Sequence, residues 1–243
     1  MVRYHAEQLT PGPFAAILAG RLPTAEVLAA LETHFGSTPP PAEQAPAPLP
    51  EPAAQHGRHH ADLPGNLQCS LRIGHRALPR HHPDHHAIRF AALILGGYFG
   101  SRLMKAIREE KGYTYGIGAQ WMALKEDGFF LIGTDVGNAY AEATLSEVRA
   151  QIERLQAEPV PAEELETARR YFLGRLTARH ETPFQLADIL RNQLVMGLPA
   201  DEEARAFAAV EGITAEALQE AAQAHFHPDK LLEVVAGSLS ESS

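Results

Sequence analysis

The chain has 243 residues, enough for one large domain or two small ones with a well-buried core. Hydrophobic residues make up 45% and charged residues 21%, as in ordinary soluble proteins, so disorder of the whole chain, collagen and coiled coil are excluded. The formal net charge of −9 argues against non-specific nucleic-acid binding, which needs a basic surface. A single cysteine, Cys69, permits neither an intrachain disulfide nor a cysteine-based metal site and is expected to be buried.

Membrane and targeting signals are weak. No stretch approaches the ~20 apolar residues of a membrane span. The short apolar run at residues 14–20 follows no basic segment, so we expect no signal peptide in this chain. Both the cytoplasm and the periplasm remain compatible with the sequence.

The first elements are a short strand and a helix. Residues 14–18 (FAAIL) predict a buried strand, and residues 25–35 predict a helix with Thr24 as N-cap and Gly36 just after its end. The composition then changes: residues 37–64 include the run TPPPAEQAPAPLPEPAA, which predicts an extended, solvated connector.

The rest of the chain predicts an α+β fold. We expect a strand at 67–73, a helix after Asp84, a break at Gly96, Gly97 and Gly100, and a second helix from Ser101. Alternation then predicts a hairpin, with Tyr115 early in its first strand. The two strands of that hairpin, the later helices and the last strand are expected at residues 113–121, 129–136, 141–155, 162–180, 184–195, 201–210, 214–226 and 231–236. This order favours a largely antiparallel sheet with helices packed on one face.

Histidine is the most obvious candidate for metal chemistry, with 13 copies. Two pairs have i, i+4 spacing, which on a helix places both rings on one face: His81 with His85 and His82 with His86. Pro83 interrupts both pairs, and no carboxylate is placed as a third ligand, so we predict no metal site in this chain. A histidine-rich metal-binding protein using His56 to His86 is kept as an alternative.

Several catalytic signatures are absent from the sequence. It contains neither H-E-x-x-H nor the inverted H-x-x-E-H, and no G-x-S-x-G nucleophile elbow. The segment GGYFGSRLMK lacks the G-K-[ST] ending of a phosphate-binding loop and is predicted to join two helices.

One pair of residues could act together. Arg108 lies late in the predicted second helix and Tyr115 follows the turn at Gly112, so a guanidinium and a phenol could converge. Both groups are hydrogen-bond donors that can stabilise an oxyanion. The alternatives are a surface ion pair of Arg108 with Glu109 or Glu110, and a core position for Tyr115.

The segment LGGYFGSRLMKAIREEKGYTYG closely resembles the signature of the second half of pitrilysin/insulinase-type zinc peptidases, the family of the mitochondrial processing peptidases. The opening segment AAILAGRLPTAEVLAALETHFG, the connector, the helix HPDHHAIRFAALILGG and the terminal elements also follow the family's order. The resemblance covers nearly the whole chain, although only the central motif is specific.

The resemblance implies two homologous halves that close around an unfolded peptide. One half carries zinc and a glutamate base. The other contributes an Arg and a Tyr, here Arg108 and Tyr115, to the substrate backbone and the oxyanion. Gly96, Gly97 and Gly100 correspond to a loop near the substrate cavity. The implied partners are a zinc-bearing half or subunit and an extended peptide.

The sequence departs from the family because the zinc half is absent. By resemblance, residues 1–36 are the end of a preceding subdomain, 37–64 a connector and 65–243 one α+β subdomain. We expect no peptidase activity from this chain alone and no cofactor in it, with zinc in the partner half. A fragment, a split subunit and a degenerate relative all fit. So does a catalytically inactive assembly subunit like the respiratory-chain core proteins.

Overall fold

The structure is a computed structural model that describes residues 15–21, 23–36 and 55–238. The chain divides into two compact units. The first comprises residues 1–53 with 179–192, and holds α2 (Thr24–Phe35) and most of α6 (Pro183–Met196). The second comprises residues 54–178 with 193–243 and carries the sheet.

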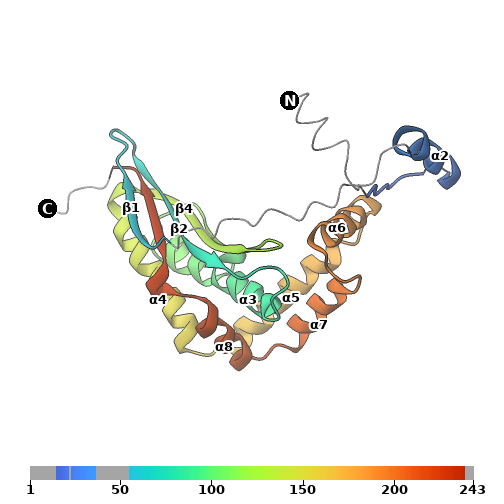
Figure 1. The fold of residues 1–243 in the computed structure, drawn as a ribbon. Helices are drawn as coiled ribbons and strands as arrows, with labels where there is room; N and C mark the ends of the chain where they lie inside the picture. Colours follow the sequence, from blue (N-terminus) through green and yellow to red (C-terminus); the bar gives the residue numbers. More distant parts are fainter. Residues whose placement is uncertain (1–14, 22, 37–54, 239–243) are drawn as a thin grey trace. The chain divides into compact units, whose positions relative to one another are not determined.

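The sheet has five strands in the order β1-β5-β2-β4-β3. These are β1 (Gly57–Ala61), β2 (Gln68–Ala77), β3 (Ile117–Ala123), β4 (Gly128–Gly137) and β5 (Leu232–Ala236). β1 pairs with β5 in parallel, and the other three pairings are antiparallel. The predicted α+β fold with a largely antiparallel sheet is therefore confirmed (Figure 1).

The helical elements are α3 (His85–Ala92), α4 (Ala141–Ala157), α5 (Ala162–Ala178), α7 (Glu202–Gly212) and α8 (Ala215–His225). Two π-helical segments, η2 (Leu93–Gly97) and η3 (Met104–Glu110), follow α3, and short 3₁₀ turns lie at Asn138–Tyr140 and Pro228–Lys230. None of the described helices is both long enough and apolar enough to cross a membrane.

One face of the sheet builds the core of the second unit. Along β2 and β4 every second side chain is buried, as the strand period of two requires. Ile73 lies opposite Ile132, and Trp121 lies opposite Phe130. Helix α3 and segment η2 pack on β3, and α4 packs on β4, which covers this face with helices. Cys69 is buried in the same core, as predicted.

Three local predictions differ from the structure. The described part of the predicted first strand, residues 15–18, is not a strand and pairs with none of the described strands. Helix α2 is present, but Pro23 occupies its N-cap in place of Thr24. The predicted connector reaches residue 64, yet β1 lies within it; residues 37–54 of that connector lie outside the described residues.

Candidate functional site

Arg108 lies in the π-helical segment η3, which is fixed from both sides. Met104 and Ile107 are buried in the core. Two residues before η3 begins, the Arg102 guanidinium donates two hydrogen bonds of 2.9 Å to the Glu164 carboxylate on α5. This bidentate geometry is the strongest form of an Arg–carboxylate pair. The segment carrying Arg108 is therefore attached to a neighbouring helix as well as to the core.

A tight turn returns the chain from η3 toward β3. Gly112 has a φ of +65°, which residues with a side chain rarely adopt. The Tyr113 N–H then donates to the Ile107 carbonyl at 3.0 Å, and the Tyr113 ring stacks on Tyr140 at a centroid distance of 4.5 Å. The turn is thus held by the backbone and by an aromatic stack.

Tyr115 lies before β3, since that strand begins at Ile117. The prediction that placed Tyr115 early in the strand is corrected on this point. A hydroxyl cluster fixes its backbone: Thr114 Oγ1 donates to the Asp135 carbonyl at 2.8 Å and accepts from the Gly116 N–H at 3.2 Å. Thr134 Oγ1 lies 2.9 Å from Thr114 Oγ1, and Thr134 is buried. The residues on both sides of Tyr115 are therefore anchored to β4, Thr114 through its hydroxyl and Gly116 through its backbone.

The structure brings Arg108 and Tyr115 together. The Arg108 guanidinium carbon lies 5.1 Å from the centre of the Tyr115 ring and 4.6 Å from the centre of the Phe99 ring. Both distances are within the range of cation–π attraction. A guanidinium carries five N–H donors, and its attraction to the rings does not require an ion pair, so these donors can bond elsewhere.

Neither alternative for this pair, a surface ion pair of Arg108 or a core position of Tyr115, is found among the described residues. Tyr115 is 91% exposed, so it is not a core tyrosine. Within residues 55–238, Arg108 makes no ion pair, and its recorded contacts are the two rings. The group is thus a half-buried cation and an exposed phenol with unused hydrogen-bonding capacity. Such a pair can donate to a carbonyl or an oxyanion.

The three glycines have different surroundings. Gly96 is buried, and a Cβ placed there would lie 2.6 Å from both the Cβ and the N of Ala119 on β3. Gly97 and Gly100 are partly exposed and flank the loop that carries Phe99. A close approach of η2 to β3 accounts for Gly96, while a role of the three in binding substrate stays a prediction.

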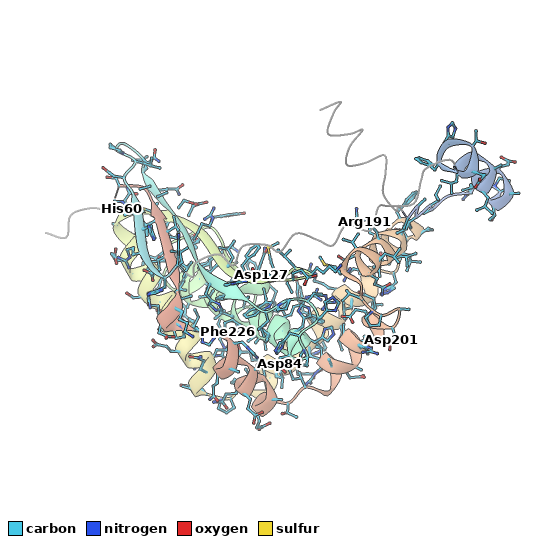
Figure 2. The ribbon with its side chains drawn as sticks, in the orientation of Figure 1. His60, Asp84, Asp127, Arg191, Asp201 and Phe226 are labelled. Carbon is cyan, nitrogen blue, oxygen red and sulfur yellow. The ribbon has the colours of Figure 1, made fainter. Side chains whose placement is uncertain are left out.

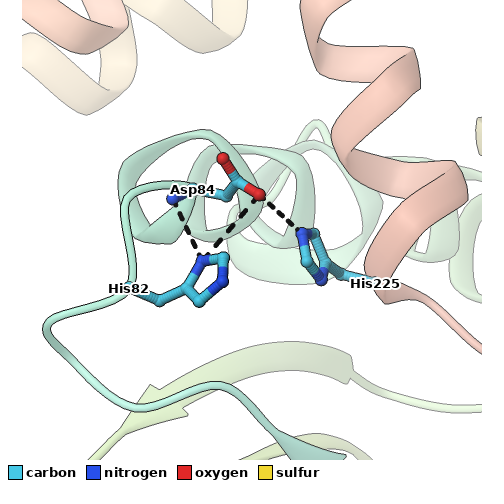
Figure 3. A group of neighbouring side chains, drawn as sticks. All are labelled: His82, Asp84 and His225. Carbon is cyan, nitrogen blue, oxygen red and sulfur yellow. Dashed lines mark hydrogen bonds and ion pairs between the residues drawn. The ribbon is translucent and has the colours of Figure 1, made fainter.

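The histidine pairs do not form helical metal sites. Helix α3 begins at His85, so neither i, i+4 pair lies on one helix, as Pro83 predicted. Asp84 precedes the helix, yet its side chain makes no capping hydrogen bond there. Asp84 lies near α3 and α8 (Figure 2), and its carboxylate instead meets His225 at 2.8 Å (Figure 3). Among the described residues, one group brings three possible metal ligands together: His82, Asp84 and His225. The prediction that no carboxylate is placed beside these histidines is therefore wrong at Asp84, because the fold brings His225 of α8 to it.

Sequence reasoning missed Phe99 and the threonine cluster. The one signal for Phe99 was a large aromatic residue inside a glycine-rich stretch. Thr114 and Thr134 are 20 positions apart, and only the register of β3 against β4 brings them into contact.

Comparisons with known proteins agree with this architecture. No curated protein matches the chain. Among solved structures, the peptidase M16 inactive domain from Pseudomonas fluorescens is 24% identical with a TM-score of 0.79, covering 91% of this chain and 53% of that one. A protease from Helicobacter pylori is 20% identical with a TM-score of 0.77, covering 88% and 53%. Complex III2 from Candida albicans is 13% identical with a TM-score of 0.70, covering 90% and 53%.

These likenesses show the fold, and the chain spans about half the length of each of these three solved structures. The family is shown by a separate match. The family model described as the peptidase M16 inactive domain matches residues 1–172, more than half of the chain. The resemblance to the pitrilysin/insulinase-type peptidases is thereby confirmed, and the chain belongs to the peptidase M16 inactive-domain family.

Proposed function

We propose that this chain is the non-zinc part of an M16-type metalloendopeptidase that binds an extended peptide and stabilises the oxyanion formed at the scissile carbonyl. The observation that carries the proposal is the meeting of Arg108 with the exposed Tyr115, with no carboxylate partner for Arg108 among the described residues. The family match supports the peptidase context.

The division of labour follows from what this sequence lacks. It has no H-x-x-E-H motif, so its residues do not fit the catalytic zinc of the family. In the proposal, zinc and the general base belong to a partner half or subunit. This chain supplies donors: the in-plane N–H groups of Arg108 and the hydroxyl of Tyr115.

The chemistry proposed for the two donors is electrostatic. As a carbonyl becomes tetrahedral its oxygen gains negative charge, and donors already in place then bind it more tightly than the carbonyl. In the proposal, the contact of Arg108 with the Phe99 ring and the anchored backbone at Thr114 limit how far the two donors must move when substrate binds. Removing one such donor usually raises the barrier by ~3 kcal/mol.

The test is peptide cleavage by the assembled enzyme. We expect Arg108→Ala and Tyr115→Phe each to lower kcat by one to three decades, with little change in stability because Tyr115 is exposed and Arg108 makes no ion pair within the described residues. Arg170→Ala, an exposed arginine on α5, is the matched control and is expected to leave kcat unchanged. If both site variants keep the wild-type kcat, the proposal is wrong.

The second candidate function is an inactive assembly subunit, which the likeness in fold to complex III2 from Candida albicans brings into consideration. An assembly role does not need an exposed Arg–Tyr pair. The same variants distinguish the two functions, because partner binding should be unchanged in both cases whereas loss of peptide cleavage is expected only if the chain is part of a peptidase.

A further inference from the structure

Three possible metal ligands from two segments of the second unit, the turn before α3 and the end of α8, lie close together (Figure 3). His82 lies in the turn before α3, Asp84 is the residue that precedes α3, and His225 is the last residue of α8. We propose that His82, Asp84 and His225 form a binding site for one divalent transition-metal ion, of which zinc is the best chemical match.

The spacing of the ligand atoms suits such an ion. Asp84 Oδ2 lies 2.8 Å from His225 Nε2 and 3.8 Å from His82 Nδ1, and one ligand atom from each residue lies within 4.8 Å of the other two. Two ligands held at about 2.0–2.1 Å in a tetrahedral site are about 3.3 Å apart. Side-chain adjustments of less than about 1 Å would therefore admit the ion.

The hydrogen bonds identify which nitrogen of each ring would bind an ion. The backbone N–H of Asp84 donates to His82 Nδ1 at 3.2 Å, so Nδ1 is the unprotonated nitrogen of this ring. An ion bound at Nδ1 replaces this long hydrogen bond, because the nitrogen has one lone pair, and the Asp84 N–H then turns to solvent. His225 Nε2 faces the carboxylate at 2.8 Å and donates to it when no ion is present. An ion at this point takes the place of the shared proton, which moves to Nδ1 of the His225 ring or to solvent.

The donor set selects the kind of ion. Two neutral imidazoles and one carboxylate suit zinc and its first-row neighbours, whereas calcium and magnesium prefer all-oxygen sites. One carboxylate leaves a net charge of +1 on the bound ion, and a water or an added ligand can complete the shell. Three protein ligands with an open position are the usual form of a non-structural zinc site.

Solvent can reach the three ligand side chains, and two packed helices hold two of them in position. The side chains of His225, His82 and Asp84 are 15%, 31% and 48% exposed, so a hydrated ion can reach them from solvent. His225 also lines a pocket of about 320 Å³ whose wall includes His227 and Trp121. Helices α3 and α8 pack directly on each other, which fixes the distance between Asp84 and His225.

The experiment titrates the full chain with Zn²⁺ alone at pH 7.5 by calorimetry, with imidazole as a weak competitor because 13 histidines can bind zinc loosely. We expect one site of micromolar or better affinity. His225→Gln and Asp84→Asn should each weaken it by at least about tenfold. The matched control His81→Gln, an exposed neighbour of His82, should leave it within about twofold.

Co²⁺ provides a second readout that does not depend on affinity. Bound by two imidazoles and a carboxylate, it should give the intense visible absorption of four- or five-coordinate cobalt, and this absorption should disappear in Asp84→Asn. Far-UV circular dichroism checks that each variant is folded, and His82→Gln stands in for any that is not. The inference is overturned if the folded variants bind Zn²⁺ as the wild type does, or if Co²⁺ shows only the weak bands of the hydrated ion.

Discussion

The Gly96→Ala substitution tests the close contact between η2 and β3 that positions the candidate site. A methyl group at Gly96 would lie 2.6 Å from the Cβ and from the N of Ala119, where ordinary contacts are 3.4–4 Å. One side of the contact must move by about 1 Å, and overpacking of this kind typically destabilises a protein by about 1–3 kcal/mol. The small gain in helix propensity, at most ~1 kcal/mol, does not offset it.

Gly174→Ala is the matched control. Gly174 lies in α5, in the same unit, with an exposed position and no atom within 4 Å of an added Cβ. Here the same substitution should stabilise the chain by about 0.5–1 kcal/mol, because alanine loses less backbone entropy in a helix than glycine. The two variants therefore have effects of opposite sign.

Urea unfolding followed by circular dichroism measures both effects, and an unchanged m-value confirms that the extent of unfolding is the same. If Gly96→Ala proves as stable as the wild type, the packing argument is refuted. A Gly96→Ala variant that is stable but no longer binds peptide would favour the predicted substrate role of this glycine instead.

Three further predictions follow from individual contacts. Phe99→Ala removes one of the two rings that contact Arg108. It should lower kcat of the assembled enzyme about two- to fivefold, the equivalent of ~0.5–1 kcal/mol. An unchanged kcat would mean that the ring does not position the guanidinium. Glu233→Gln removes a buried charge that pairs with Arg58 and Arg149 at 2.8–3.0 Å. It should lower the free energy of unfolding, measured by urea unfolding, by about 1–3 kcal/mol, less than for a fully buried pair because both arginines are half-exposed. Glu158→Gln is the control, because Glu158 forms an exposed pair with Arg154, and it should change the free energy of unfolding by less than about 0.5 kcal/mol. Equal effects of Glu233→Gln and Glu158→Gln would contradict the argument that burial makes the Glu233 pair important. Burial lowers the pKa of His75 in the folded state. As the pH decreases below the unfolded pKa of about 6.5, the unfolded state binds the proton first, so the free energy of unfolding decreases by up to ~1.4 kcal/mol per pH unit. His75→Gln should flatten that slope in urea titrations between pH 6.5 and 5, and an unchanged slope would assign it to other groups. The charged groups that act on His75 are His227, Lys230 and Asp229.

The helices and the hairpin could be predicted from the sequence because their apolar residues repeat with the period of the element. The helix predicted at 162–180 is α5 (Ala162–Ala178), and the strand predicted at 129–136 is β4 (Gly128–Gly137). Such local patterns need no knowledge of the partner element.

Strand β1 could not be predicted in this way. Its five residues, GRHHA, are all exposed and show no apolar alternation. The strand exists because β5, about 175 positions later, offers a parallel edge for its backbone. The start of β3 was misjudged for a related reason: the alternation continues back through Tyr115, but the hydroxyl of Thr114 takes the backbone hydrogen bonds there.

The candidate site was partly predictable. The motif resemblance identified Arg108 and Tyr115, and the turn at Gly112 made their convergence plausible from spacing. Phe99 came from the structure alone. So did the partner of Asp84, because its carboxylate turns away from the helix that it was predicted to cap and toward His225, 141 positions later.

The central claim is that this chain acts beside a zinc-bearing half, and the most direct measurement is to purify the chain from its native source and identify what co-purifies by mass spectrometry. The account predicts a partner chain, or a longer form of the same polypeptide, that carries an H-x-x-E-H motif and gives zinc-dependent peptide cleavage. Co-purification only with proteins that lack the motif would contradict it, and Arg108 and Tyr115 would then have to be explained without catalysis.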